Sequence, residues 1–183
     1  MTTFFTSDTH FSHSKIIEYC NRPFANADEM NHALITNWNN KVSNTDDIYI
    51  LGDVFFCKMA ESIEILSQLN GKIHVVLGNH DKVIHDNQAL KKKFHHICPP
   101  LYEKRIDDIS VVMCHFPLLT WNKSHRGAFM LYGHAHGGIP FDPTVRRMDV
   151  GVDCHNYAPV SWEEIKLKLL NVPVQELDSR NSY

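Results

Sequence analysis

The chain has 183 residues, of which 43% are hydrophobic and 21% charged, and its formal net charge is -3. These values are ordinary for a globular protein with a sizeable core, so we expect a single domain over residues 1–183. The weak negative charge excludes a general attraction to long nucleic acid, although a nucleotide could still bind through metal ions.

The five cysteines form no CxxC pair, which argues against a disulfide framework and favours a reducing compartment. The sequence contains no secretion signal and no apolar run near membrane-spanning length. We therefore expect a cytoplasmic protein without a membrane partner.

The first half of the chain predicts alternating strands and helices. A strand over residues 2–7 is followed by a helix that begins near Ser12, whose hydroxyl is a suitable N-cap, and by a second helix over residues 28–38. A strand at 48–51 precedes a helix at 58–69, and a strand at 73–77 precedes a polar helical segment that runs to Lys93.

The second half is richer in strands. Segments 102–106 and 109–114 flank Asp107-Asp108, a pair typical of a hairpin turn. Strands at 129–132 and 148–152 follow, a capping box from Ser161 to Glu164 opens a last helix, and a short strand is expected from Val172. Alternating units followed by a strand-rich half predict an α/β fold in which two sheets form a sandwich flanked by helices.

Five of the predicted strands end directly in side chains that can bind a metal. In layered α/β sheets, functional residues gather just beyond the carboxyl ends of the strands, and three of these ends carry a glycine that lets the backbone turn sharply. If the five ends lie side by side, their ligands converge on one point and are too many for one ion: Asp8, His10, Asp53, Asn79, His115, His134 and His136.

This ordered set closely resembles the motifs of the calcineurin-like metallophosphoesterases: Asp8-x-His10, Gly52-Asp53, Gly78-Asn79-His80-Asp81, His115 and Gly133-His134-x-His136. The resemblance implies a four-layer α/β/β/α sandwich with two mixed sheets and two divalent ions at the strand ends. It also implies that one ion is held by Asp8, His10 and His136, that the other is held by Asn79, His115 and His134, and that Asp53 bridges both. The segments 8–13, 22–24 and 150–153 are similar to those of a small, compact branch of the family found in bacteria and their phages.

The types of ligand indicate which ions would bind. Imidazoles, carboxylates and one amide suit first-row transition metals better than Ca²⁺, and we expect Mn²⁺, with Fe²⁺, Zn²⁺ or Ni²⁺ as alternatives. The two aspartates bring two negative charges against the four positive charges of two ions. The excess positive charge can be neutralised by a water-derived nucleophile and an anionic substrate, which a closed structural site would not need.

Four further residues are candidates near this site. His80 follows a ligand and is predicted to be the general acid for the leaving oxygen, while Asp81 is expected either to orient the His80 ring or to cap the next helix. Arg22 could bind a substrate phosphate or form a structural ion pair. Trp121 could stack on a base, although an anchor in the core is the favoured interpretation.

These features predict a metal-dependent phosphoesterase, a hydrolase of ester bonds, whose favoured substrate is a small nucleotide-type phosphodiester. A phosphomonoesterase of the same fold is the alternative within the class. A noncatalytic interaction module is the alternative from another class, and the complete ligand set together with His80 argues against it.

Overall fold

The computed structural model describes residues 1–174. Its elements, in chain order, are β1 (Thr3–Thr6), α1 (Ser14–Tyr19), α2 (Ala27–Lys41), β2 (Asp47–Ile50), α3 (Met59–Ser67), β3 (Lys72–Val76), α4 (Lys82–Asp86), α5 (Gln88–Lys91), β4 (His96–Cys98), β5 (Leu101–Ile106), β6 (Ile109–Cys114), the 3₁₀ turn η1 (Ser124–Arg126), β7 (Phe129–Tyr132), β8 (Arg147–Asp149), the 3₁₀ turn η2 (Val152–Cys154), β9 (Val160–Ser161) and α6 (Trp162–Leu169).

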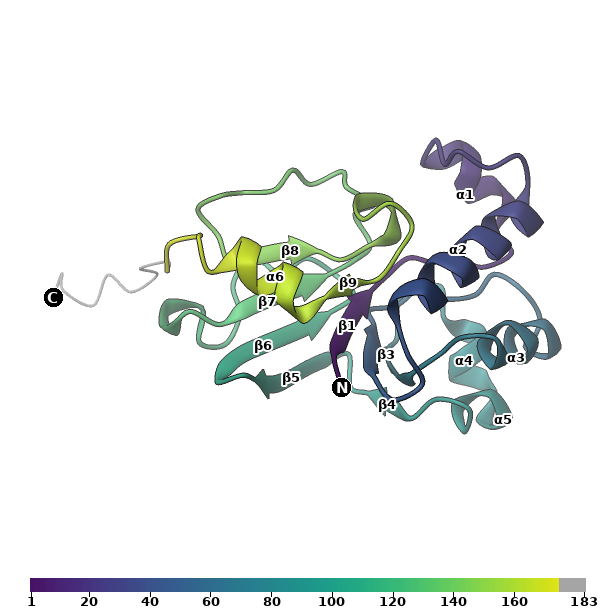
Figure 1. Ribbon diagram of the computed structural model, residues 1–183, viewed down its shortest axis with the longest axis horizontal. Coiled ribbons are helices and arrows are strands. Elements are labelled where there is room, and N and C mark those ends of the chain that lie inside the picture. Colours follow the sequence, from purple (N-terminus) through teal and green to yellow (C-terminus); the bar gives the residue numbers. More distant parts are fainter. Residues whose placement is uncertain (175–183) are drawn as a thin grey trace, which may run out of the picture.

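Two mixed sheets form the sandwich. The first has the order β4-β3-β2-β1-β9, in which β1 to β4 run parallel and β9 is antiparallel to β1. The second has the order β5-β6-β7-β8, in which only β5 is antiparallel to its neighbour. Figure 1 shows α1 to α5 gathered beyond the first sheet, on the side away from the second. The predicted sandwich of two mixed sheets is confirmed.

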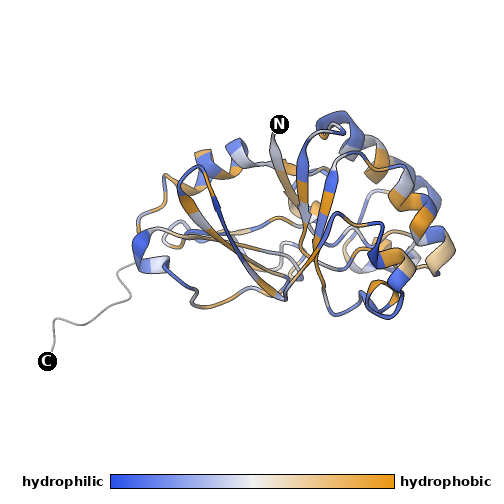
Figure 2. Cartoon of the chain, turned by 90° about the horizontal axis from the view of Figure 1, so that it is seen from below, coloured by the Kyte–Doolittle hydropathy of each residue, from blue (hydrophilic) through white to orange (hydrophobic). Residues whose placement is uncertain are grey.

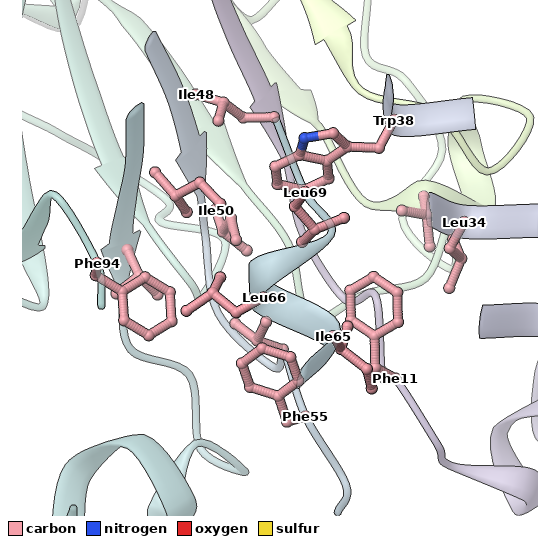
Figure 3. Close-up of a cluster of buried hydrophobic side chains, with 14 of the residues drawn as sticks. Phe11, Leu34, Trp38, Ile48, Ile50, Phe55, Ile65, Leu66, Leu69 and Phe94 are labelled. Carbon is pink, nitrogen blue, oxygen red and sulfur yellow. The ribbon is translucent and has the colours of Figure 1, made fainter. Parts of the chain in front are cut away.

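Alternating apolar residues give each sheet two buried faces. In β2, Ile48 and Ile50 face the helices, while Tyr49 faces the second sheet. Figure 3 shows the helix-side cluster, in which Trp38 of α2 and Leu66 of α3 pack beside the strand residues. Burying a side chain of this size stabilises the fold by about 1.5–3 kcal/mol.

The second sheet is covered differently on its two faces. Its inner face packs against the first sheet, and α6 closes one side of that inter-sheet core with Trp162, Ile165 and Leu169. Its outer face is covered by the segment 116–128, which contains η1, where the family resemblance implied a helical layer. Lys123 and Gly127 of this segment adopt left-handed backbone angles, which prevent a long helix.

Several local predictions differ from the structure. Ser12 does not cap α1; its N–H donates to Asn31 and its hydroxyl to Glu61, so His13 holds the cap position without a side-chain bond. The polar helix expected up to Lys93 is two short helices, because Asn87 is extended between them. The hairpin at Asp107-Asp108 and the Ser161–Glu164 capping box are confirmed.

Two remaining predictions concern the chain ends and the cysteines. The short strand expected from Val172 lies largely outside the described residues, since the description ends at residue 174. All five cysteines are free thiols, in agreement with the absence of a disulfide framework. Among the residues that the structure describes, no helix combines the length and apolar character needed to cross a bilayer. Figure 2 shows instead that polar and apolar residues alternate along the helices.

Candidate metal centre

The structure brings the seven predicted ligands together at one end of the sandwich. Asp8 and His10 follow β1, Asp53 follows β2 and Asn79 follows β3, while the remaining ligands His115, His134 and His136 follow β6 and β7 of the second sheet. Backbone hydrogen bonds align these ends: His10 N–H donates to Asp53 C=O, and Gly133 N–H donates to His115 C=O.

The first ligand group consists of Asp8, His10 and His136. Asp8 Oδ1 lies 3.9 Å from His10 Nε2 and 3.8 Å from His136 Nε2, too far for hydrogen bonds. Asp8 Oδ1 and His10 Nε2 are buried and have no hydrogen-bond partner. Atoms bound to one ion at about 2.0–2.2 Å lie roughly 3–4 Å apart. Orphaned polar atoms at this spacing therefore fit a divalent ion.

The second ligand group consists of Asp53, His115 and His134. Asn79 lies beside it, with its Oδ1 3.0 Å from His115 Nε2. Asp53 Oδ2 lies 3.5 Å from His115 Nε2 and 3.8 Å from His10 Nε2 of the first group. One carboxylate oxygen thus lies between the two groups, where a ligand shared by two ions would have to be.

Four of the ligand side chains, those of Asp8, Asp53, His115 and His136, have a second partner that fixes their direction. Asp8 Oδ2 accepts the His134 N–H at 2.8 Å, and Asp53 Oδ1 accepts the His80 N–H at 2.9 Å, so the other oxygen of each faces the centre. His115 Nδ1 lies 2.7 Å from Leu51 C=O and His136 Nδ1 lies 2.7 Å from an Asp153 oxygen. These acceptors place the proton on Nδ1 and leave the Nε2 lone pair for a metal.

The backbone of the ligands is strained. Five of the seven have positive φ, between 47° and 67°, a region that non-glycine residues rarely adopt: Asp8, His10, Asp53, His134 and His136. Such residues cost about 1–3 kcal/mol each and cluster at functional sites. Gly133 permits the crowding, because a Cβ there would collide with Ser7 Oγ and Asp8 Oδ2. The fold therefore holds the ligand loops in place against local preference.

Burial and neighbouring charges set the protonation of the site. Burial raises the pKa of Asp8 to about 6, although the nearby His136 and His115 lower it. Burial lowers the pKa of His10 to about 2, so this ring is neutral. For His115 and His136, burial lowers the pKa, but the carboxylates of Asp53 and Asp153 outweigh it and raise the pKa above its ordinary value. The carboxylates thus attract positive charge, as a cation site requires.

The neighbouring residues His80 and Asp81 differ in burial: the His80 side chain is exposed and the Asp81 side chain is buried. The His80 side chain is exposed at the mouth of the site, with its ring centroid 6.1 Å from that of His10. The two roles predicted for Asp81 are wrong: it makes no side-chain cap, and both its oxygens are taken by backbone N–H groups, so it does not orient the His80 ring. Asp81 is only 1% exposed and lies beneath the loop of Asp53.

Arg22 and Trp121 do not reach a substrate. The Arg22 side chain is fully buried and pairs with Asp153, so a contact with substrate phosphate is wrong and the structural ion pair is correct. Trp121 is 9% exposed and its indole N–H donates to Ala128 C=O, so it is the anchor in the core. Asp153 belongs to the segment 150–153 that carries part of the family resemblance and was not predicted as a ligand; its side chain reaches the site through the His136 ring.

A third group of possible ligands, Cys20, His136 and Asp153, overlaps the first. It is not a separate cation site, because Arg22 already donates to both oxygens of Asp153. The guanidinium supplies the positive charge that an ion would bring.

A sandwich of two mixed sheets with this ordered ligand set at its strand ends is the arrangement that the resemblance to the calcineurin-like metallophosphoesterases implies. The chain belongs to the same family as the uncharacterized protein MJ1445 of Methanocaldococcus jannaschii, which is 37% identical over 166 residues that cover 87% of this chain and 86% of that protein.

Two further proteins are similar to this chain. The gene 66 protein of Mycobacterium phage L5 is 26% identical over 179 residues, covering 82% of this chain and 86% of the phage protein. The crystal structure of AQ665 from Aquifex aeolicus, a protein of unknown function, shares the fold with a TM-score of 0.71 at 23% identity and covers 91% of this chain and 98% of that one. No family model matches the chain.

Proposed function

We propose that the protein is a phosphoesterase that uses two divalent ions, with Mn²⁺ favoured over Fe²⁺, Zn²⁺ or Ni²⁺. One observation carries this proposal: Asp53 Oδ2 lies between His10 Nε2 and His115 Nε2, at 3.8 and 3.5 Å. A carboxylate oxygen between two sets of imidazoles supports a pair of ions with one shared ligand, which is the arrangement of two-metal phosphoryl-transfer sites.

In this proposal each ligand has a defined place. Asp8, His10 and His136 would hold the first ion, and Asn79, His115 and His134 the second, with Asp53 shared. Bound ions would supply a nucleophilic water at neutral pH and neutralise the phosphate oxygens. Asp81 and Asp153 would act only through the residues that they position.

His80 would supply the proton for the leaving group. Its backbone N–H is fixed on Asp53 Oδ1 at 2.9 Å, while its ring is exposed beside the first ligand group. A protonated ring nitrogen at this place could donate to the departing ester oxygen and then take up a proton again from water.

The surroundings of the centre favour a phosphodiester of nucleotide type. On one side, Phe116 is 45% exposed with its ring centroid 4.7 Å from that of His134. On the other side, His13 and Phe56 are stacked at 3.7 Å near His10. Two flat surfaces suit an ester with an organic group on each side of phosphorus, and bases stack well on such rings. A monoester, the alternative substrate, would need only one.

The test is to purify the protein, remove its metal, and restore Mn²⁺, Fe²⁺, Zn²⁺ or Ni²⁺ before assay. We expect hydrolysis of bis-nitrophenyl phosphate and of small nucleotide diesters, with slower hydrolysis of nitrophenyl phosphate. A faster monoester reaction would favour the phosphomonoesterase. Two bound ions without hydrolysis of any ester would favour the noncatalytic interaction module.

A further inference from the structure

Arg22 is a fully buried cation that touches none of the site's surface. It lies between α1 and α2, and its side chain has 0% exposure. Burying a guanidinium costs free energy unless its five N–H donors are matched. Here one N–H faces Met30 Sδ at 3.4 Å, and four oxygen atoms accept from the others. These acceptors are the two oxygens of Asp153 and the carbonyls of Asp8 and Thr9.

The first pair of bonds fixes the loop that carries two ligands. Arg22 Nη2 donates to Asp8 C=O at 2.7 Å, and Nη1 donates to Thr9 C=O at 3.0 Å. Both flanking ligands of this loop are left-handed, with φ of 55° at Asp8 and 49° at His10. Because this backbone is strained, hydrogen bonds from outside the loop are needed to keep it in place.

The second pair of bonds fixes a ligand from the other sheet. Arg22 Nε and Nη2 each donate to an Asp153 oxygen at 2.8 Å, a bidentate pair. One of these oxygens lies 2.7 Å from His136 Nδ1 and orients that ring. Arg22 therefore reaches His136 through Asp153.

The second ligand group has anchors of its own. His115 Nδ1 faces Leu51 C=O, and the peptide of Asp53 donates to Asp81. No hydrogen bond of Arg22 reaches Asn79, His115 or His134 within the described residues. The direct hydrogen bonds of Arg22 are thus confined to one half of the centre, and the other half is linked to Arg22 only through the loop of Asp8 and His10.

The structure assigns Arg22, through Asp153 and the carbonyls of Asp8 and Thr9, as the positioning residue of the first ligand group alone. The assignment rests on the proposed metal centre. It makes the two halves separable, because removal of Arg22 should weaken one ion and spare the other. Loss of a residue that hydrogen-bonds to a metal ligand typically lowers the affinity for the metal 10–100-fold.

The test compares Arg22→Met and Asp153→Asn with the wild type by equilibrium dialysis against graded free Mn²⁺ and by electron paramagnetic resonance. In Asp153→Asn, the amide nitrogen faces an N–H of Arg22 in either orientation, because Arg22 donates to both Asp153 oxygens. The bidentate pair is therefore lost without a change of volume. Arg146→Met is the matched control, because the Arg146 guanidinium also donates to three backbone carbonyls, those of Gly127, Leu170 and Val172.

We expect the wild type and Arg146→Met to bind two Mn²⁺ and to show the spectrum of an exchange-coupled pair. Arg22→Met and Asp153→Asn should keep one ion at wild-type affinity, bind the other about 10–100-fold more weakly, and show an isolated Mn²⁺ spectrum. Two ions at wild-type affinity in both variants, or equal weakening of both ions, would overturn the role of Arg22. If Arg22→Met does not fold, Asp153→Asn decides. A wild type that binds fewer than two ions would overturn the proposed centre itself.

Discussion

Replacement of Asp81 by Asn should destabilise the protein and loosen Asp53. Asp81 Oδ2 accepts the N–H groups of Gly78 and Asp53 at 2.7 and 2.8 Å, and its Oδ1 accepts the N–H of Val54 at 2.8 Å. This single carboxylate therefore joins the two loops that follow β2 and β3. An Asn has only one acceptor oxygen, so its amide nitrogen must face at least one of these N–H donors.

The magnitude follows from the bonds that cannot be kept. In the best orientation the Asn oxygen takes the place of Oδ2 and keeps two bonds, while the Val54 N–H loses its acceptor. A hydrogen bond to a charged group contributes about 1.5–3 kcal/mol, and an unsatisfied buried donor costs about 1–3 kcal/mol. Burial raises the pKa of Asp81, so removing its charge recovers part of this loss. We expect a decrease of about 3 kcal/mol in the free energy of unfolding.

The assay is urea unfolding of the metal-free protein at neutral pH, followed by Mn²⁺ dialysis of the folded variant. Asp142→Asn is the control: Asp142 also accepts a backbone N–H, that of Thr144, but this hydrogen bond is exposed to solvent, so the urea midpoint should not change. If Asp81→Asn lowered the free energy of unfolding by less than about 1 kcal/mol, the three bonds would not carry the strength assigned to them.

Three further outcomes are expected. Asp53→Ala should lose both ions while His10→Ala loses one, as elemental analysis can show; two retained ions in Asp53→Ala would refute the shared ligand. His80→Ala should keep both ions but lose turnover by about two to four orders of magnitude. The loss should be smaller for an ester with a nitrophenyl leaving group, which needs little protonation. An equal loss across a leaving-group series would exclude the acid role. Because the pKa values of His115 and His136 are raised, protons compete with the metal at a higher pH than for an ordinary imidazole. Mn²⁺ affinity should therefore fall as pH is lowered from about 8 to 6, with proton uptake, and a constant affinity would contradict this.

The strand ends were the part of the site that local sequence could predict. Apolar runs that stop at Asp8, Asp53 or His115 show where a strand ends, and parallel strands bring such ends together. The two-sheet fold followed from the same runs. The pairing that holds the ligands could not be found in this way. Asp153 follows the strand predicted at 148–152, but no local pattern pairs it with Arg22, which is 131 positions away.

Local rules failed where tertiary contacts replaced them. Ser12 has the composition of a helix cap, but Asn31 and Glu61 take its hydrogen bonds. Asp81 stands where an acidic cap is expected, yet its side chain accepts two N–H groups from the loop after β2 and one from the loop after β3 instead. In both cases a polar side chain close to a helix start had a partner from a distant segment, which no pattern of neighbouring residues reveals.

The ligand set is divided between the two sheets, and this has a mechanical consequence. Along most of their length the sheets meet through the apolar side chains of the inter-sheet core, such as Phe5 and Leu131, whose contacts have little directional preference. Bonds from ligands of both sheets to the proposed ions are directional, so at this end they would fix the angle at which one sheet lies over the other. Removal of the ions with a chelator should therefore raise amide hydrogen exchange first at the last residues of β6 and β7, before the rest of either sheet opens.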